Sequence, residues 1–402
     1  MSENGRLTSD VCVVGGCGHV GLPLALSLAA TGLKVSIHDT NDAAVKAVSA
    51  GEMPFLEDGA VEILDEVVGG RLIVANDVRL VSAARVVVVV IGTPVDEHLN
   101  PTFHAMRRFF RDLAPHLADG QCVILRSTVY PGTTEKVRGL LQGEGRKLHL
   151  AYCPERIAQG HAIRELKQLP QIISGCDSEA VRMAAELFGR IAPSCIQLTP
   201  IEAELAKVFT NTWRYIQFAT ANQFLMMALD HGVDFYRVYD ALVQDYPRMQ
   251  GLPRGGFAAG PCLLKDTMQL AAAYNNNFQL GHAAMLVNEG LPSYLVRQMV
   301  DRYPLSRMKV GILGMTFKAD VDDSRESLSF KLRKLLEYEA AEVLCTDEYL
   351  NDPRLLSLST VVERSDILVL GAPHAAYRRL RLDPAKPLVD VWNFFGKGVF
   401  GA

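Results

Sequence analysis

Cys262 is the side chain whose type and surroundings most suggest covalent chemistry. It follows a stretch rich in glycine and proline, residues 255–261, and it precedes Lys265 and Asp266 by three and four residues. Loops of this kind bring backbone close to a ligand. A thiol at the N-terminus of a helix has a lowered pKa and therefore a larger thiolate fraction. The residues alone leave two interpretations open, a nucleophile or a small buried side chain.

Further charged and polar groups stand at spacings of functional interest. Lys207, Asn211 and Arg214 are separated by four and three residues, which places them on one face of a helix. Glu155 and Arg156 follow an apolar run that is typical of a strand. A solvated helix face and ordinary loop charges would explain these groups equally well.

Two other sets of residues carry less information when taken alone. A charged loop, residues 317–325, contains Lys318 and Arg325 after an apolar run. The other seven cysteines are scattered and form no C-x-x-C pair, so we expect thiols in a reducing compartment and predict no metal site.

A dinucleotide-binding motif begins at Gly16. Gly16, Gly18 and Gly21 form the pattern G-x-G-x-x-G between an apolar run and a helical stretch, and Asp39 follows Gly16 by 23 residues. The glycines are expected to permit a tight turn, the approach of a pyrophosphate, and close helix–strand packing, in that order. The helix N-terminus offers N–H groups to the phosphates. Asp39 can accept from a ribose 2′-hydroxyl and would repel a 2′-phosphate, which predicts NAD rather than NADP.

Two loops that carry hydroxyl groups follow later strands of this region. Thr93 comes after the apolar run of residues 85–91, and Ser127 and Thr128 come after residues 121–125. In an open parallel sheet both loops emerge at the carboxyl edge, where ligands bind. These hydroxyls could contact the nicotinamide ribose or the substrate, or they could simply end their loops.

The elements that must position these groups alternate between short apolar runs and helical stretches. Such alternation, with nearly continuous apolar strands, is typical of a parallel, doubly wound α/β sheet. The expected strands are residues 11–14, 34–38, 85–91, 121–125, 149–153 and 172–174, and later 309–313, 341–345, 366–370 and 387–391.

A long helical segment separates the two α/β regions. Thr199 can be its N-cap, Pro200 its first residue, and Glu202 the partner in a capping box. The helical pattern continues to about residue 230, which at 1.5 Å per residue gives a length of about 45 Å. We expect two Rossmann-like domains joined by a central helical domain, with boundaries at residues 1–198, 199–303 and 304–402.

Length, composition and charge exclude several classes of protein. The 402 residues suggest two or three domains, and 49% apolar residues suffice for cores. The net charge of −4 predicts neither a nucleic-acid nor an anionic-membrane partner. No apolar run approaches the roughly 20 residues that a bilayer requires. Because the first ten residues are polar, we expect no secretory signal and a cytoplasmic location.

Taken together, these segments resemble the UDP-glucose/GDP-mannose dehydrogenase family. The matching runs lie in family order between residues 16 and 327: GCGHVG, GTP, STVYPGTT, PERIAQGHA, EAELAKVFTN, GPCLLKD and FKADVDDSRES. The resemblance implies oxidation of the C6 alcohol of a nucleotide sugar to the carboxylate with two NAD⁺. It also implies an NAD-binding domain, a central helical domain, a nucleotide-sugar-binding domain, and a homodimer formed through the central helices.

The resemblance also assigns roles to individual residues. It implies a thiohemiacetal and then a thioester on Cys262, an oxyanion stabilised by Lys207 and Asn211, and proton handling by Asp266, Thr128 and Glu155. To act as a base near neutral pH, Glu155 would need a carboxyl pKa raised by burial. The implied cofactor contacts are Gly16, Gly18, His19, Val20, Gly21, Asp39, Thr93, Thr128 and Arg325. The implied substrate contacts are Glu155, Arg156, Lys207, Asn211, Arg214, Arg248, Gly256 and Lys318.

The identity of the sugar depends on a few positions. Pro-Glu-Arg at residues 154–156, together with Arg214 and Arg248, is similar to the branch that oxidises UDP-N-acetylhexosamines, of the mannosamine or glucosamine type. The chain departs from the family at Ala259 and Pro261 before the cysteine, and at Tyr246 and Trp392, where relatives carry histidine and arginine. An alanine adopts a positive φ only at a cost in free energy, so we expect the path of this loop to differ from that in relatives.

Three alternatives to oxidation of a UDP-N-acetylhexosamine remain open. UDP-glucose is the alternative substrate within the family. A dehydrogenase of 2- or 3-hydroxy acids would perform a single two-electron oxidation and need no thiol. A catalytically silent NAD-binding protein would have no use for Cys262, Lys207 and Asp266, all of which are present. Fold alone does not decide among these functions.

Overall fold

The computed structural model describes residues 9–92 and 103–401, which fall into two units, 1–209 and 210–402. The boundary lies within the long helix α9, Pro200–Asp230, and each unit is described by itself. No helix within the described ranges is both long and apolar enough to cross a membrane.

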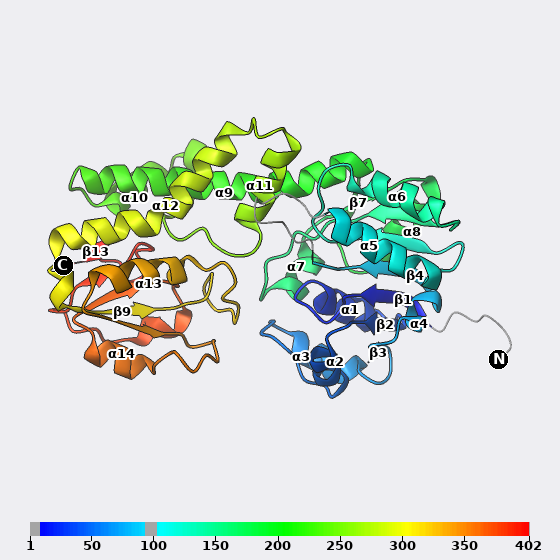
Figure 1. The fold of residues 1–402 in the computed structure, drawn as a ribbon, viewed down its shortest axis with the longest axis horizontal. Coiled ribbons are helices and arrows are strands. Elements are labelled where there is room, and N and C mark those ends of the chain that lie inside the picture. Colours follow the sequence, from blue (N-terminus) through cyan, green and yellow to red (C-terminus); the bar gives the residue numbers. More distant parts are fainter. Residues whose placement is uncertain (1–8, 93–102, 402) are drawn as a thin grey trace. The chain divides into compact units, whose positions relative to one another are not determined.

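The first unit is built on one sheet with the strand order β3-β2-β1-β4-β5-β6-β7-β8 (Figure 1). Its pairs are parallel from β3 through β6, β7 runs antiparallel to β6, and β8 is parallel to β7. The strands are β1 Ser9–Val14, β2 Val35–His38, β3 Leu72–Ala75, β4 Ala84–Val89, β5 Cys122–Leu125, β6 His149–Tyr152, β7 Gln171–Gly175 and β8 Cys195–Gln197.

Helices cover both faces of this sheet, and alternate side chains of β1 show why. Val11 and Val13 belong to one hydrophobic core, whereas Cys12 and Val14 belong to the other. Because successive strand residues point to opposite faces, a fully apolar strand requires a core on each side. The helices are α1 Gly21–Ala30, α2 Asp42–Ser49, α3 Ala60–Val67, α4 Arg79–Ser82, α5 Phe103–Leu113, α6 Thr133–Gly143, α7 Ala162–Gln168 and α8 Ser178–Phe188. The predicted doubly wound sheet is confirmed.

The second unit combines helices with a smaller sheet of order β10-β9-β11-β12-β13, in which only β13 is antiparallel to its neighbour. The strands are β9 Lys309–Leu313, β10 Glu342–Thr346, β11 Ile367–Leu370, β12 Leu388–Val389 and β13 Phe400–Gly401. The remaining helices are α10 Phe235–Val243, α11 Leu263–Ala273, α12 Gln279–Arg302, α13 Leu328–Glu339 and α14 Leu358–Arg364. Leu225, Leu291 and Ile312 share one core, so the helical segment packs directly on this sheet.

The start of α9 agrees with the sequence prediction. Pro200 is its first residue, and Glu202 Oε2 accepts from the backbone N and the Oγ1 of Thr199 at 2.8 and 2.7 Å. Some other details differ from expectation. The strands β3, β8 and β13 were not predicted from the sequence. All three lie at an edge of their sheet, where most of their side chains are partly buried or exposed and give a weak apolar pattern.

Candidate functional site

The glycine-rich loop between β1 and α1 contains two glycines that packing requires and one that leaves open space. A Cβ at Gly16 would lie 2.9 Å from Ile37, and a Cβ at Gly21 would lie 2.6 Å from the Cα of Gly16. A Cβ at Gly18 would meet nothing within 4 Å. The loop and helix therefore need Gly16 and Gly21 for packing, while Gly18 leaves room for a ligand at the N-terminus of α1.

The role expected of Gly16 in the turn is corrected by the structure. The residue with left-handed backbone is Gly15, at φ +74°, and a Cβ there would lie 2.3 Å from the carbonyl oxygen of Val90. Gly16 has no positive φ. The G-x-G-x-x-G pattern does not include Gly15, so the pattern alone could not assign the turn to it.

Asp39 lies where a ribose-binding acid is required. It directly follows β2, and its Oδ2 accepts from the backbone N of Cys17 at 2.9 Å. Its Oδ1 accepts from the backbone N of Asn41, also at 2.9 Å. The carboxylate is thereby held against the glycine-rich loop while remaining partly exposed. The open space at Gly18, the free N-terminus of α1 and this acid fit NAD.

Two further residues of the loop were expected to touch the cofactor. His19 is partly buried, and its ring lies 4.0 Å from that of Phe55, centroid to centroid. Val20 is the N-cap of α1. Their position at the mouth of the loop is compatible with the expected role.

Of the three hydroxyl residues expected at the carboxyl edge of the sheet, two lie among the described residues. Ser127 Oγ donates to the carbonyl oxygen of Ile91 at 2.6 Å and accepts from its N at 2.9 Å, which joins the ends of β4 and β5. Thr128, next in the chain, is partly exposed. Thr93 lies outside the described residues.

Glu155 has a different environment from the one expected for a base. Its Oε2 accepts from the fully buried guanidinium of Arg126, and its Oε1 accepts from the backbone N of Arg156 and Ile157 at 2.6 and 2.8 Å. Both carboxylate oxygens are therefore already engaged in hydrogen bonds. The adjacent Arg156 donates through Nη2 to the carbonyl oxygen of Pro170.

Glu204 is an organising residue that the sequence analysis missed. This buried residue of α9 accepts from the backbone N of Gly132 and Thr134 at 2.5 and 2.7 Å, and from the Thr134 hydroxyl at 2.5 Å. Burial raises the pKa of its carboxyl group. Glu204 thus connects α9 to the loop that starts at Thr128. Its place within the EAELAKVFTN run was the available signal.

The helical spacing of Lys207, Asn211 and Arg214 is present in α9, but the three side chains differ in burial. Lys207 and Asn211 are 9% and 6% exposed, whereas Arg214 is exposed. Asn211 Nδ2 donates to Asp266 Oδ2 at 2.5 Å. The expected grouping therefore holds for the first two residues, and Arg214 lies on the solvated part of the helix.

Cys262 is the N-cap of α11 and is the one cysteine exposed to solvent among those described. Its carbonyl oxygen accepts from the backbone N of Asp266 at 2.8 Å, in the first turn. The Asp266 carboxylate is fully buried and pairs with Lys265 Nζ at 2.9 Å as well as with Asn211. An exposed thiol at a helix N-terminus, one turn from a buried acid and an amide, is arranged for nucleophilic chemistry.

The loop of residues 317–325 brings a cation into the electrostatic range of this thiol. Asp323 binds Arg325 through two parallel hydrogen bonds, Nε to Oδ1 at 2.9 Å and Nη2 to Oδ2 at 2.6 Å. These bonds raise the pKa of Arg325, and the charge of Cys262 acts in the same direction. Lys318, earlier in the loop, is partly buried.

The remaining predicted substrate residues lie around the cysteine loop. Arg248 is exposed and donates to the Tyr246 hydroxyl at 3.3 Å, with its guanidinium 5.7 Å from that ring. Gly256 is in contact with the ring of Trp392. The positive φ angles of this loop belong to Gly256 and Gly260 and not to Ala259, and the expected difference in loop path stays a prediction.

Comparison with known proteins finds one family whose profiles match three successive parts of the chain. Profiles of the UDP-glucose/GDP-mannose dehydrogenase family match its NAD binding domain over residues 9–192, its central domain over 201–290 and its UDP binding domain over 311–397. The chain belongs to this family. The expected NAD cofactor and NAD-dependent nucleotide-sugar dehydrogenase activity are thereby confirmed.

Relatives of the family resemble the chain over nearly its full length. UDP-N-acetyl-D-mannosamine dehydrogenase of Pyrococcus horikoshii is 29% identical over 396 residues, covering 96% of this chain and 92% of the relative. An NDP-N-acetyl-D-galactosaminuronic acid dehydrogenase of Ralstonia nicotianae is 28% identical, covering 92% of each.

Two solved structures show that the fold does not select the sugar. The UDP-D-ManNAc dehydrogenase of P. horikoshii matches with a TM-score of 0.87 and 27% identity, covering 96% of each chain. A UDP-glucose dehydrogenase of Pyrobaculum islandicum has the same TM-score at 25% identity, covering 98% of this chain and 96% of that one.

The two kinds of glycine in this family's NAD-binding loop predict different mutant phenotypes. Gly18→Ala should weaken NAD⁺ binding about tenfold or more, with the Tm unchanged, because its methyl group enters only ligand space. Gly21→Ala forces a methyl group against backbone and should lower the Tm by roughly 3–10 °C. Calorimetric titration with NAD⁺ and thermal denaturation measure both. A stability loss in Gly18→Ala with intact affinity would contradict the assignment.

Proposed function

We propose that this chain oxidises the C6 alcohol of a UDP-N-acetylhexosamine, of the N-acetylmannosamine or N-acetylglucosamine type, to the carboxylate. The observation that carries the proposal is the exposed Cys262 thiol at the N-terminus of α11, one turn from the hydrogen-bonded pair of Asp266 and Asn211. A single alcohol oxidation would need no such nucleophile. The domain boundaries at residues 198 and 303 are part of this proposal.

Cys262 performs covalent catalysis between two oxidations. Bound NAD⁺ supplies the hydride acceptor. Once the alcohol has become an aldehyde, the thiolate forms an S–C bond to C6 as the π bond of the carbonyl breaks, and the oxygen takes up the proton released in the first oxidation to become the hydroxyl of a thiohemiacetal. Loss of a second hydride and a proton leaves a thioester. Water then attacks C6, the C–S bond breaks, and the carboxylate leaves while the thiolate is restored. Each sugar thus consumes two NAD⁺ and one water.

Lys207 and Asn211 stabilise the oxyanion that develops in these steps. A buried ammonium group and an amide N–H supply charge and a hydrogen bond without reorganisation, which is the most effective form of such catalysis. Asp266, which already accepts from Asn211, positions water and handles protons together with Thr128.

To serve as a base at the thioester stage, Glu155 must break one of the hydrogen bonds that its carboxylate accepts. Both of its oxygens accept hydrogen bonds, from Arg126 on one side and from two backbone N–H groups on the other. We therefore propose that its first role is to hold the loop of Arg156 and to present a fixed negative charge.

Substrate contacts are proposed at Glu155, Arg156, Lys207, Asn211, Arg214, Arg248, Gly256 and Lys318, with Arg325 near the cofactor. Exposed arginines such as Arg214 and Arg248 suit a ligand that carries two phosphates. The preference for an N-acetylated sugar is supported by Arg156 and by the similarity to UDP-N-acetyl-D-mannosamine dehydrogenases.

A substrate panel tests this proposal. The purified protein with NAD⁺ should give kcat/KM at least about tenfold higher for UDP-N-acetylmannosamine or UDP-N-acetylglucosamine than for UDP-glucose, a margin typical of one pocket contact. Preference for UDP-glucose would establish the alternative within the family. Activity with a simple 2- or 3-hydroxy acid, and none with any nucleotide sugar, would contradict the proposal altogether.

We also propose a homodimer formed through α9. Its solvent-facing side carries Trp213, Phe224 and Met227, which are 61%, 40% and 52% exposed and recur at spacings that share one helix face. Large exposed apolar side chains on one helix face are typical of an interface.

Trp213→Glu should convert the dimer to a monomer at micromolar concentration, because the change places a charge on that apolar face. Light scattering coupled to size exclusion measures the mass. The control is Tyr338→Glu on α13, where an aromatic side chain is 89% exposed but lies elsewhere, and which should leave the mass unchanged. Equal masses for wild type and Trp213→Glu would exclude α9 as the interface.

A further inference from the structure

One buried side chain forms two hydrogen bonds with the backbone of the loop that leads to Cys262. Asn222 of α9 is fully buried, and its Nδ2 donates to the carbonyl oxygen of Gly256 at 2.9 Å. Its Oδ1 accepts from the backbone N of the same residue at 2.8 Å. The carboxamide therefore satisfies both polar groups of Gly256, as a neighbouring strand would.

A second asparagine determines the orientation of the first. Asn222 Nδ2 also donates to Oδ1 of Asn288 on α12 at 2.9 Å, and Asn288 Nδ2 donates to the carbonyl oxygen of Tyr215 at 3.0 Å. Asn288 is likewise fully buried. If Asn222 were flipped, its oxygen would face two acceptors, so the network permits one orientation.

The opposite side of Gly256 and the far end of the loop are held as well. The ring of Trp392 occupies the position of a Cβ at Gly256, with ring atoms 2.2 Å from it. Four residues later, the backbone N of Gly260 donates to the carbonyl oxygen of Glu326 at 3.2 Å, and a Cβ there would lie 2.5 Å from the ring of Phe317. The loop therefore has two anchors, at Gly256 and Gly260.

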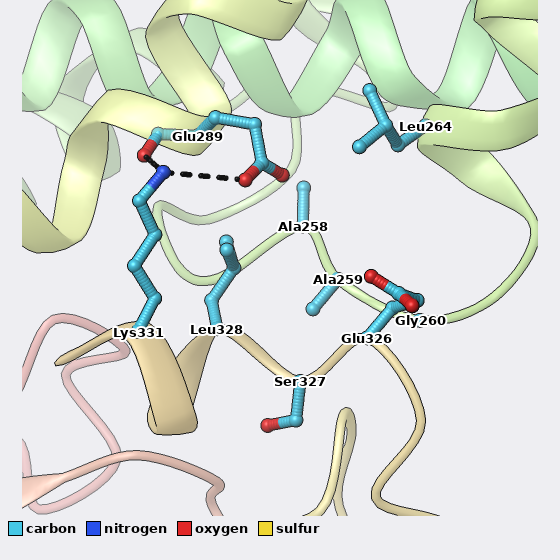
Figure 2. Close-up of a pocket in the computed structure, with 9 residues that line it drawn as sticks. All are labelled: Ala258, Ala259, Gly260, Leu264, Glu289, Glu326, Ser327, Leu328 and Lys331. Carbon is cyan, nitrogen blue, oxygen red and sulfur yellow. Dashed lines mark hydrogen bonds and ion pairs between the residues drawn. The ribbon is translucent and has the colours of Figure 1, made fainter. Parts of the chain in front are cut away.

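Between these anchors, one side of the loop borders a pocket. Ala258, Ala259 and Gly260 line a pocket of about 200 Å³, which Glu289 and Lys331 border from α12 and α13 (Figure 2). Lys331 Nζ donates to the carbonyl oxygen of Glu289 at 2.6 Å at the border of this pocket. Phe257 and Ala258 are buried in the adjoining cores, so the anchors at Gly256 and Gly260 act together with packing to fix the path of the chain into Cys262.

We propose that Asn222, oriented by Asn288, is a positioning residue for the Cys262 thiol. The inference rests on the proposed nucleophilic role of Cys262. Because only the second oxidation uses the thiol, loosening Gly256 should retard thiohemiacetal formation and leave the first hydride transfer intact. A displacement of about 1 Å can reduce such a step about a hundredfold.

Asn222→Asp tests the proposal with little change in shape. It keeps an acceptor for the N of Gly256 but replaces the Nδ2 donor with an oxygen that faces Gly256 O and Asn288 Oδ1. We expect kcat for uronate formation to fall about tenfold to a hundredfold, with KM for NAD⁺ within about twofold of wild type.

Trapping of the aldehyde separates positioning from mere destabilisation. Hydroxylamine condenses with free aldehyde to an oxime and water, so in its presence the ratio of NADH to sugar consumed should fall from near two toward one in Asn222→Asp. The control is Leu64→Ala, a fully buried change on α3 in a core that contains no residue of the loop, which should lower the Tm by roughly 5–15 °C and leave the ratio unchanged.

Asn288→Ala provides the same measurement if Asn222→Asp does not fold. It retains both bonds between Asn222 and Gly256 but frees the carboxamide to rotate, so a smaller shift of the ratio in the same direction is expected. A ratio equal to wild type in the folded variants, or a loss of activity that merely follows the Tm, would overturn the proposal. Failure of the proposed function is distinguishable, because wild type itself would then release one NADH per sugar.

Discussion

Replacing Cys262 by serine should reduce uronate formation by about 10⁴-fold or more, because loss of a covalent nucleophile removes the route through the thioester. Cys262 is exposed and is the N-cap of α11, so its thiol is accessible and lies at the positive end of the helix dipole. A serine hydroxyl has the same shape but stays protonated at neutral pH. The first oxidation needs no thiol, and the variant should therefore release at most one NADH per sugar.

The control for this prediction is a cysteine with no assigned chemistry. Cys195 in β8 is partly buried, and burial raises the pKa of its thiol. Cys195→Ser should retain two NADH per sugar and nearly full turnover. Uronate produced by Cys262→Ser at a rate within tenfold of wild type would eliminate the thioester mechanism.

Removal of the Lys207 ammonium group should lower kcat by about 10²–10³-fold, the usual effect of deleting one donor to an oxyanion. Lys207 is 9% exposed and stands one helical turn before Asn211, so its charge acts in a site largely shielded from water. Lys207→Met preserves most of the side-chain volume. Both oxidations should slow, whereas the dissociation constant of NAD⁺ should stay within about twofold of wild type.

Steady-state kinetics of Lys207→Met beside Lys167→Met measure this effect. Lys167 is an exposed lysine of the same unit, on α7, and its loss should change kcat by less than twofold. If Lys207→Met raised KM for the sugar and left kcat intact, Lys207 would bind the ground state only and would not stabilise the transition state.

Local signals in the sequence predicted the frame of the molecule well. The G-x-G-x-x-G loop, the acid at Asp39 and the start of α9 at Pro200 all lie as expected, because each depends on a few neighbouring residues. The strands β3 and β8 were missed because they lie at the edges of the sheet, where most of their side chains are partly buried or exposed and the apolar pattern is weak.

Long-range partners of the site residues were beyond local reasoning. Glu155 looks like an isolated acid after a strand, yet Arg126, 29 positions earlier, neutralises it. Arg214 shares the helical spacing of Lys207 but lies in solvent, since spacing determines a face and not its coverage. Asn222 and Asn288 form part of no motif, and only the fold brings them to Gly256.

The most direct test of the central claim is the number of NADH molecules formed per UDP-N-acetylhexosamine consumed by the wild-type protein. The account predicts two NADH per sugar, with a uronate as the product and no free aldehyde. One NADH per sugar, with an aldehyde or ketone as the product, would contradict the four-electron oxidation through Cys262 and would favour a simple alcohol dehydrogenation.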